Sequence, residues 1–213
     1  MTVLSHPDEW LRVDRTPSPG SPALFVDRDG TLIENVPYLA DPDHVRVIDG
    51  AVDTILEFRA RGYAIIVVSN QSGIARGNCS VEQYRAVEER VQKLLGEGAA
   101  DVVYACPFHP DGLVAFSRAH SSRKPAPGML LDAARRFGIR LATSVIVGDS
   151  LVDMQAGANA GVGRLIHVLT GHGRTDAAAV SNFAATIDKA VETAVTIAKV
   201  DPTPPCQSMA SRR

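Results

Sequence analysis

Short, continuously apolar runs alternate with helical patterns along most of this chain, and this alternation constrains its fold more than any other feature. The runs lack the every-second-residue pattern of half-exposed strands, so we expect strands covered on both faces. In chain order, the segments are ALFVD, AVDTILEFRARG, YAIIVVSN, VEQYRAVEERVQKLLG, DVVYAC, PGMLLDAARRFG, SVIVGD, LVDMQAGANAG and RLIHVL, with a last helix within AAAVSNFAATIDKAVETAVTIAKV. This order predicts an α/β fold built on a doubly wound parallel sheet.

The length and composition of the chain fit a single domain of this kind. With 213 residues, of which 45% are hydrophobic, the chain can form one well-buried core but is short for two. Residues 1–22 are polar and proline-rich, so we expect a flexible arm that Trp10 and Leu11 can anchor to the body. We place the folded domain at 23–200 and expect a disordered tail over 201–213.

The charge balance and the cysteines narrow the class of partner and the compartment. Lys and Arg number 22 against 24 Asp and Glu, so there is no basic field to attract nucleic acid or an anionic membrane. The three cysteines are widely spaced, which argues against a disulfide framework and for a reducing compartment. No run reaches the roughly 20 apolar residues of a membrane-spanning helix. We therefore expect a cytoplasmic protein that binds a small, specific molecule.

Chemically useful side chains lie where the predicted strands end. Asp27 ends the first apolar run, Ser69 follows the second, and Asp149 ends SVIVGD. Lys124 precedes a predicted helix within RKPAPG. Ligands of doubly wound folds bind at the carboxyl ends of the strands, so these side chains should converge on one edge of the sheet.

Two aspartates stand one residue apart in LFVDRDGTLIE, which runs from Leu24 to Glu34. One interpretation is a tight turn, because Asp-Gly pairs are common in turns and Asp readily binds nearby amides. The other is chemical. Asp27 would act as a nucleophile, and Asp29 would protonate the leaving oxygen and later deprotonate water.

Crowded carboxylates also need a counter-cation. Asp27, Asp149 and a backbone carbonyl form a hard-oxygen site suited to Mg²⁺, and the expected ligand set is Asp27, Asp29 and Asp149. The alternative is that Asp149 and Asp153, in GDSLVDMQAG, only cap and charge the start of a helix. The position of Asp149 at the end of a buried strand favours metal binding.

The expected phosphate-binding residues are Ser69, Asn70 and Lys124. A serine hydroxyl and adjacent backbone amides can hold a phosphoryl oxygen, although a serine at this point can also begin a turn or cap a helix. Lys124 can be a solvated surface charge, the usual fate of a lysine. Beside the carboxylates, it would instead neutralise charge that develops on a transferring group.

The order of DRDGT, the Ser69 strand end, Lys124 and GDSLVD resembles the haloacid dehalogenase superfamily of aspartyl-phosphate phosphatases. The resemblance runs from about Ala23 to Gly173. SNQSGIARG, CPFHPDG and RKPAPGM are similar to the branch that contains the heptose bisphosphate and histidinol-phosphate phosphatases, and the first and last of these favour the heptose enzymes. This branch lacks a large cap domain, and the stretches after Asp29 and Ser69 are too short for one.

The resemblance implies a Mg²⁺-dependent phosphomonoesterase that works through an aspartyl phosphate on Asp27, with Asp29 as acid and base. The expected reaction removes the C7 phosphate of D-glycero-D-manno-heptose 1,7-bisphosphate. The closest alternative is histidinol-phosphate hydrolysis at the same site. A phosphosugar-binding protein without turnover is another, but the intact Asp27 and Asp29 argue against it, and a nucleic-acid end phosphatase conflicts with the charge balance. We expect a monomer.

Two arginines are expected to meet the remote end of the substrate. Arg76 and Arg123 would provide guanidinium donors for a second phosphate at C1 of a heptose, and they disfavour a cationic alcohol such as histidinol. Either arginine can instead be a solvated surface charge.

One loop departs from the pattern of the family. The resemblance implies a structural zinc loop with Cys-x-His followed by Cys-x-Cys, but this chain has Phe108 at a ligand position and His120-Ser121-Ser122 before Arg123. Cys106, His109 and His120 offer at most three ligands, whereas structural Zn²⁺ takes four. We therefore expect no structural zinc and a loop held by packing of Phe108 and Phe116, with an ordinary buried thiol at Cys106.

Overall fold

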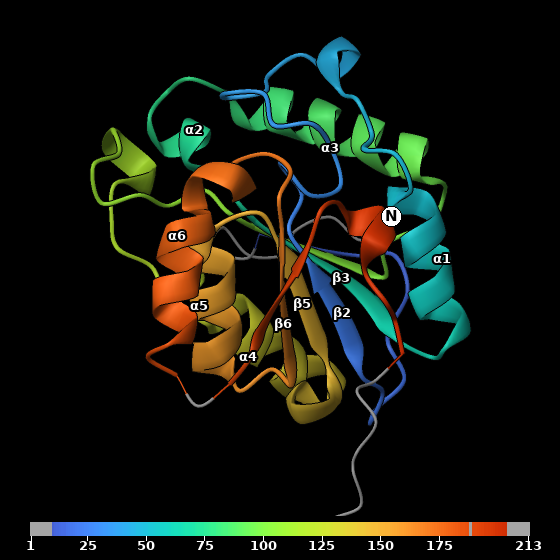
Figure 1. Ribbon diagram of the computed structural model, residues 1–213. Helices are drawn as coiled ribbons and strands as arrows, with labels where there is room; N and C mark the ends of the chain where they lie inside the picture. The colour runs from blue at the N-terminus through green and yellow to red at the C-terminus, as the bar shows by residue number, and fades with distance from the viewer. Residues whose placement is uncertain (1–9, 188, 204–213) are drawn as a thin grey trace, which may run out of the picture.

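The computed structural model describes residues 10–187 and 189–203, which form one seven-stranded sheet with helices on both faces (Figure 1). The strand order is β1-β4-β3-β2-β5-β6-β7. The strands are β1 (Leu11–Val13), β2 (Ala23–Val26), β3 (Ala64–Asn70), β4 (Val102–Cys106), β5 (Val145–Gly148), β6 (Arg164–Val168) and β7 (Val191–Ala194). All neighbours are parallel except β1, which is antiparallel to β4. The predicted doubly wound α/β fold is confirmed.

The helices follow the strands in the order expected of crossover connections. They are α1 (Ala51–Ala60), α2 (Ser72–Ala75), α3 (Val81–Leu95), α4 (Gly128–Phe137), α5 (Leu151–Ala160) and α6 (Gly173–Ala184). Short 3-10 turns lie at η1 (Pro42–His44), η2 (Val114–Phe116), η3 (Leu141–Thr143) and η4 (Ile197–Lys199). No helix in the described part of the chain is both long and apolar enough to cross a membrane.

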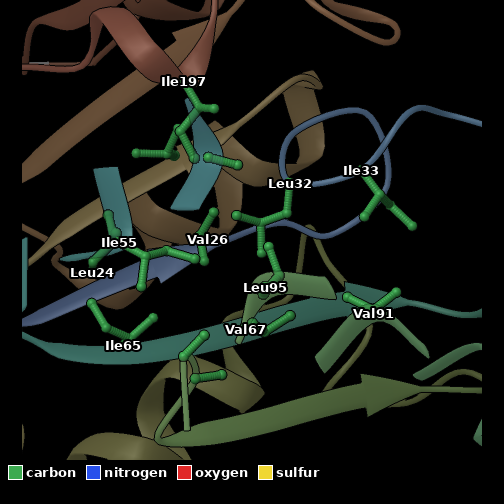
Figure 2. Close-up of a cluster of buried hydrophobic side chains, with 14 of the residues drawn as sticks. Leu24, Val26, Leu32, Ile33, Ile55, Ile65, Val67, Val91, Leu95 and Ile197 are labelled. Atoms are coloured by element: carbon green, nitrogen blue, oxygen red, sulfur yellow. The ribbon is translucent and has the colours of Figure 1, made fainter. Parts of the chain in front are cut away.

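The sheet is buried on both faces, as the continuously apolar runs predicted. Along β2, Leu24 and Val26 point into the core that α1 and α3 cover, whereas Phe25 points into the core beneath α4, α5 and α6. Figure 2 shows the first of these cores, where Leu24 lies beside Ile65 and Val26 beside Val67 of the neighbouring strand. Burial on both faces fixes the strands in register and leaves their carboxyl ends as the polar edge.

The N-terminal segment is attached to the body at the residues predicted to anchor it. Trp10 packs 5.6 Å from the Tyr84 ring, and Leu11–Val13 pairs with the open edge of β4, a strand that was not predicted in the flexible arm. A three-residue edge strand among prolines carries too little pattern to be recognised in the sequence. Residues 1–9 and 204–213 lie outside the described residues.

The last predicted helix, placed within residues 177–200, is present but occupies only the first part of that segment. The helix α6 runs from Gly173 to Ala184, and Val191–Ala194 forms β7, parallel to β6, a strand that was not predicted. The β-branched Val191 and Thr193 fit a pleated strand, and β6 would otherwise be an open edge of the sheet. The helix in this alanine-rich segment therefore ends before β7, which covers the otherwise open edge of β6.

Candidate active site

A cleft of about 470 Å³ opens at the carboxyl ends of β2, β3 and β5. Of the predicted site residues, it is lined by Asp27, Asp29, Ser69, Asn70, Lys124 and Asp149. Arg76 and Arg123 are not among its lining residues. The lining also contains Tyr38, Asn35 and His172, and the side chains of Asn35 and His172 form a 2.8 Å hydrogen bond. The sheet edge therefore gathers six of the eight predicted residues around one cavity.

Asp27 is positioned by the sheet itself. Its backbone N–H donates to the carbonyl oxygen of Val147 at 2.9 Å, which extends the pairing of β2 and β5 by one residue. Gly30 follows with a φ of 87°, a conformation that lets the chain turn away directly after Asp29. Asp27 is only 7% exposed, so the strand end holds a carboxylate at the buried floor of the cleft.

Lys124 joins two aspartates in this floor. Its ammonium group lies 2.6 Å from the Asp27 Oδ1 atom and 2.6 Å from the Asp153 Oδ1 atom, and it donates to the Val68 carbonyl at 2.7 Å. Burial would lower the pKa of Lys124, but Asp153 and Asp27 outweigh it and raise the pKa, so the lysine stays charged. The solvated-surface interpretation of Lys124 is therefore wrong, because the residue is 3% exposed.

Asn70 fixes the segment that carries this lysine. Its side-chain amide donates to the Lys124 carbonyl at 2.9 Å, and its side-chain oxygen accepts the Lys124 backbone N–H at 3.0 Å. The side chain of Asn70 thus positions Lys124. A phosphate contact by Asn70 is left to its backbone amide and stays a prediction.

Three buried carboxylates gather at this point. Asp27, Asp149 and Asp153 each offer a carboxylate oxygen within 4.8 Å of the others. Among the described residues, no other group of three or more Asp, Glu, His or Cys side chains brings its ligand atoms this close together. Burial, followed by the neighbouring carboxylates, raises the pKa of Asp27 well above its usual range, although Lys124 opposes this. Burial also raises the pKa of Asp149 to about 6.

These raised pKa values indicate a shortage of positive charge. One lysine faces three carboxylates, and the donor set consists of oxygen atoms only, which are the ligands that Mg²⁺ prefers. The Asp149 Oδ2 atom also accepts the His172 backbone N–H at 2.7 Å. Gly30 and Gly171 pack so tightly against it that a Cβ atom on either would collide with this oxygen. The residues present therefore fit a hard divalent cation.

Asp29 is held away from this cluster by other partners. Both of its carboxylate oxygens accept hydrogen bonds from the Arg28 guanidinium at 3.1 Å. The Gln71 side-chain amide donates to Asp29 Oδ2 at 2.9 Å, and the Ser69 hydroxyl donates to the same atom at 3.3 Å. Ser69 thus lies beside the predicted acid as well as near the predicted phosphate position.

Four residues of the site were not predicted as functional from the sequence. Asp153 was weighed only as a helix-start charge, and it does accept from the Ser150 backbone N–H and hydroxyl, but it also pairs with Lys124. Its spacing of four residues from Asp149 could have indicated that both lie at one end of α5. No comparable spacing or motif in the sequence indicated that Gln71, Arg28 or His172 would be part of the site.

The predicted substrate arginines lie near each other, outside the lining of the cleft. An Arg76 Nη atom is 3.0 Å from the His109 Nε2 atom, and the Arg123 guanidinium donates to the Phe108 carbonyl at 3.3 Å. Burial, followed by Arg123 and Arg76, lowers the pKa of His109. We call Arg76, His109 and Arg123 the distal rim, and their crowding shows that positive charge is concentrated there.

The loop that departs from the zinc pattern is filled by an aromatic stack. The Phe108 ring lies 4.3 Å from the His120 ring at an interplanar angle of 19°, and the Arg118 guanidinium lies 4.2 Å from the Phe108 ring centre. Phe116 packs 5.7 Å from Phe108, as predicted. Cys106 is buried, and this also agrees with the prediction. The zinc content of the protein stays a prediction.

Comparisons with known proteins agree with this geometry. Residues 34–161 match the family model for haloacid dehalogenase-like hydrolases. A D-glycero-β-D-manno-heptose-1,7-bisphosphate 7-phosphatase from Yersinia pestis is 41% identical over 179 residues, covering 80% of this chain and 95% of the relative. The enzyme of that name from Escherichia coli K12 is 42% identical over 153 residues, covering 70% and 80%.

A solved structure shares the fold over nearly the same length. The D,D-heptose 1,7-bisphosphate phosphatase from B. bronchiseptica, complexed with magnesium and phosphate, superposes with a TM-score of 0.70 at 28% identity. The similarity covers 84% of this chain and 94% of that chain. A magnesium ion and a phosphate are thus present together in a protein of the same architecture.

Proposed function

This chain belongs to the haloacid dehalogenase-like hydrolases, and from that premise we propose that it removes the C7 phosphate of D-glycero-β-D-manno-heptose 1,7-bisphosphate. It is a phosphoric monoester hydrolase, as its curated relatives are. The observation that carries the proposal is the buried Asp27 carboxylate, held 2.6 Å from Lys124 at the carboxyl edge of the sheet. This arrangement supports Asp27 as nucleophile and Lys124 as phosphate ligand.

Mg²⁺ is the proposed cofactor. Asp27 and Asp149 are its proposed carboxylate ligands, and Asp153 lies within reach of the same position while it pairs with Lys124. The proposed third ligand, Asp29, would contribute its backbone carbonyl, because Arg28, Gln71 and Ser69 already engage its carboxylate oxygens. When bound, the cation would neutralise charge on the phosphoryl oxygens and on the crowded carboxylates.

In the first step, Asp27 attacks the phosphorus atom in line with the bond to the C7 oxygen. That bond breaks, and its electron pair goes to the leaving oxygen, which takes the proton of the Asp29 carboxyl group. Lys124, the Ser69 hydroxyl and the Asn70 backbone amide stabilise the equatorial oxygens. The products of this step are the sugar 1-phosphate and an aspartyl phosphate on Asp27.

In the second step, water attacks the phosphorus atom of the aspartyl phosphate. Asp29, now ionised, accepts a proton from the water, and the bond between phosphorus and Asp27 breaks. Inorganic phosphate leaves, and both aspartates return to their starting forms. Gln71, Ser69 and Arg28 all donate to the Asp29 carboxylate, and these contacts support the ionised form that acts as base in this step.

The distal rim supports a bisphosphate over histidinol phosphate. Arg76, His109 and Arg123 concentrate basic groups beyond the cleft, which suits a second phosphate and disfavours a cationic alcohol. We further propose that the protein is a cytoplasmic monomer that acts on this small phosphosugar, with neither nucleic acid nor membrane as a partner.

Phosphate release from a substrate panel tests the proposed function. The panel contains heptose 1,7-bisphosphate, heptose 7-phosphate, other hexose phosphates and histidinol phosphate, each with Mg²⁺. We expect the highest kcat/KM for the bisphosphate, with the anomeric phosphate retained in the product. A higher kcat/KM for histidinol phosphate would replace the proposed substrate, and binding without release of phosphate would favour a non-catalytic role.

A further inference from the structure

Arg28, which separates the two catalytic aspartates in the sequence, is among the largest fully buried side chains, at 1% exposure. A guanidinium carries five N–H donors, and burying it is costly unless they are paired. Its Nε and Nη2 atoms donate to the two oxygens of Asp29 at 3.1 Å, and Nη1 donates to Glu88 Oε2 at 3.2 Å. Burial would lower the pKa of Arg28, but Asp29 and Glu88 outweigh it and raise the pKa.

The second partner of this arginine belongs to a polar stripe on the inner face of α3. Tyr84, Glu88 and Gln92 follow one another at intervals of four residues, and all are buried. The Arg28 guanidinium lies 5.6 Å from the Tyr84 ring centre, and the Gln92 amide donates to Glu88 Oε1 at 2.8 Å. The inner face of a helix ordinarily carries apolar residues, so this stripe needs a reason.

One reason could be purely structural, because a buried Arg28–Glu88 pair can hold α3 against the loop after β2. That role does not require the other edge of the guanidinium to donate two parallel hydrogen bonds to Asp29. Such a pair of hydrogen bonds fixes the plane of a carboxyl group. Gln71 holds Asp29 Oδ2 from another wall of the cleft. The hydrogen bonds from Arg28 and Gln71 therefore act together to fix the orientation of the Asp29 carboxyl group.

We propose that Arg28, supported by Glu88, is a positioning residue that fixes the Asp29 carboxyl group for proton transfer to the leaving oxygen. This inference rests on the proposed function, which makes Asp29 the acid and base. A proton donor must lie within hydrogen-bond reach of its acceptor, and small misplacements cost rate steeply. Because Glu88 neutralises Arg28, the pair supplies directed donors without net positive charge beside a group that releases and accepts a proton.

The leaving group distinguishes positioning from simple structural support. A sugar alkoxide needs the Asp29 proton as its bond to phosphorus breaks, whereas 4-nitrophenolate departs as a stable anion. For both substrates, kcat/KM reports steps up to this bond cleavage. Loss of correct positioning should therefore lower kcat/KM for the heptose bisphosphate and leave that for 4-nitrophenyl phosphate nearly unchanged.

The decisive variant is Arg28→Lys, which keeps the charge balance with Glu88 but cannot grip Asp29 with a planar fork. We expect its kcat/KM for the heptose bisphosphate to fall about tenfold to a hundredfold, and that for 4-nitrophenyl phosphate by less than about threefold. Arg28→Met/Glu88→Gln removes both buried charges together and should show the same selective loss. Thermal unfolding of each variant checks that the fold is retained.

Asp29→Asn on the same two substrates provides the reference. Its kcat/KM for the heptose bisphosphate should fall further than in any Arg28 variant, while that for 4-nitrophenyl phosphate stays nearly unchanged. Equal losses for both substrates in Asp29→Asn would overturn the proposed role of Asp29, and this inference with it. If Asp29→Asn is selective but folded Arg28→Lys loses both activities equally, or neither, then Arg28 is structural and the inference alone is overturned.

Discussion

The floor of the cleft and its distal rim are built in opposite ways. The floor consists of Asp27, Lys124, Asp149 and Asp153, whose exposed fractions are 7%, 3%, 2% and 1%. Two of these residues follow directly from central strands, and Lys124 forms ion pairs with the Asp27 and Asp153 carboxylates. Short side chains on buried strand ends have little freedom, so the sheet itself sets the positions of the reacting groups.

The distal rim instead consists of side chains on loops and at the end of α2. Arg76 is exposed, and His109 and Arg123 are half-buried. They contact one another and the Phe108 carbonyl rather than a carboxylate cluster. From this difference we propose that the reaction and the choice of substrate are separable here. Changes in the floor should affect every phosphomonoester, whereas changes in the rim should affect only those with a remote anionic group.

The largest effect is expected for Asp27→Asn. An amide is a poor nucleophile and a weaker metal ligand, so turnover should fall by several orders of magnitude on the heptose bisphosphate and on 4-nitrophenyl phosphate alike. Phosphate release, with circular dichroism to check folding, measures this. Asp53→Asn, at an exposed position on α1, is the matched control and should behave like the wild type. Phosphate release at the wild-type rate by purified Asp27→Asn would contradict the assignment of Asp27 as the nucleophile.

Removal of the metal should abolish activity on both substrates. The floor has three buried carboxylates, and the pKa of Asp149 is raised to about 6, so a divalent cation is needed to balance the charge. EDTA treatment followed by assay, then by addition of Mg²⁺, checks the loss and its recovery. Activity that survives exhaustive chelation would show that the carboxylates serve another purpose.

A smaller and selective effect is expected for Arg123→Ala. Loss of a charge-assisted contact should cost roughly 1.5 to 3 kcal/mol, or on the order of tenfold to a hundredfold in kcat/KM, for the heptose bisphosphate. The main change should be a raised KM, and 4-nitrophenyl phosphate should be affected far less. Arg85→Ala, exposed on α3, controls for the loss of a surface charge. Equal losses on both substrates would mean that Arg123 serves the reacting phosphate.

The smallest expected signal is the zinc content. Phe108 stacks on His120, and the Nδ1 atom of His120 accepts the Ser122 backbone N–H at 3.1 Å, so packing accounts for the order of this loop. We expect elemental analysis of the purified protein to find no stoichiometric zinc. About one zinc per chain would show that Cys106, His109 and His120 form a metal site, and that the loop of the distal rim is held by a metal ion rather than by packing.

The floor could be predicted from the sequence because its residues interrupt strong local patterns. Asp27 and Asp149 end continuously apolar runs, and the carboxyl ends of parallel strands necessarily meet. Lys124 was predicted from its place in the loop before a helix that begins at this edge, and the resemblance of its motif supported the prediction. Asp153 was misjudged because a helix-start carboxylate looks the same in sequence whether or not it faces a lysine.

The link between Arg28 and Glu88 could not be predicted by such reasoning. The two residues lie 60 positions apart, and a glutamate within a helical pattern ordinarily faces solvent. The strand β7 was missed for a related reason, since Val191 and Thr193 sit in an alanine-rich segment whose local preference is helical, and pairing with β6 decides the outcome. Tertiary contacts, rather than local propensity, set both features.

The central claim, that the floor forms a covalent intermediate on Asp27, is tested most directly by trapping that intermediate. The protein is mixed with heptose 1,7-bisphosphate and Mg²⁺, quenched in acid after a few milliseconds, digested, and analysed by mass spectrometry. We predict one phosphoryl group on the peptide that contains Asp27, present during turnover, lost once the substrate is consumed and absent in Asp27→Asn. Rapid phosphate release with an unmodified Asp27 peptide, or with the phosphoryl group on another residue, would contradict the account.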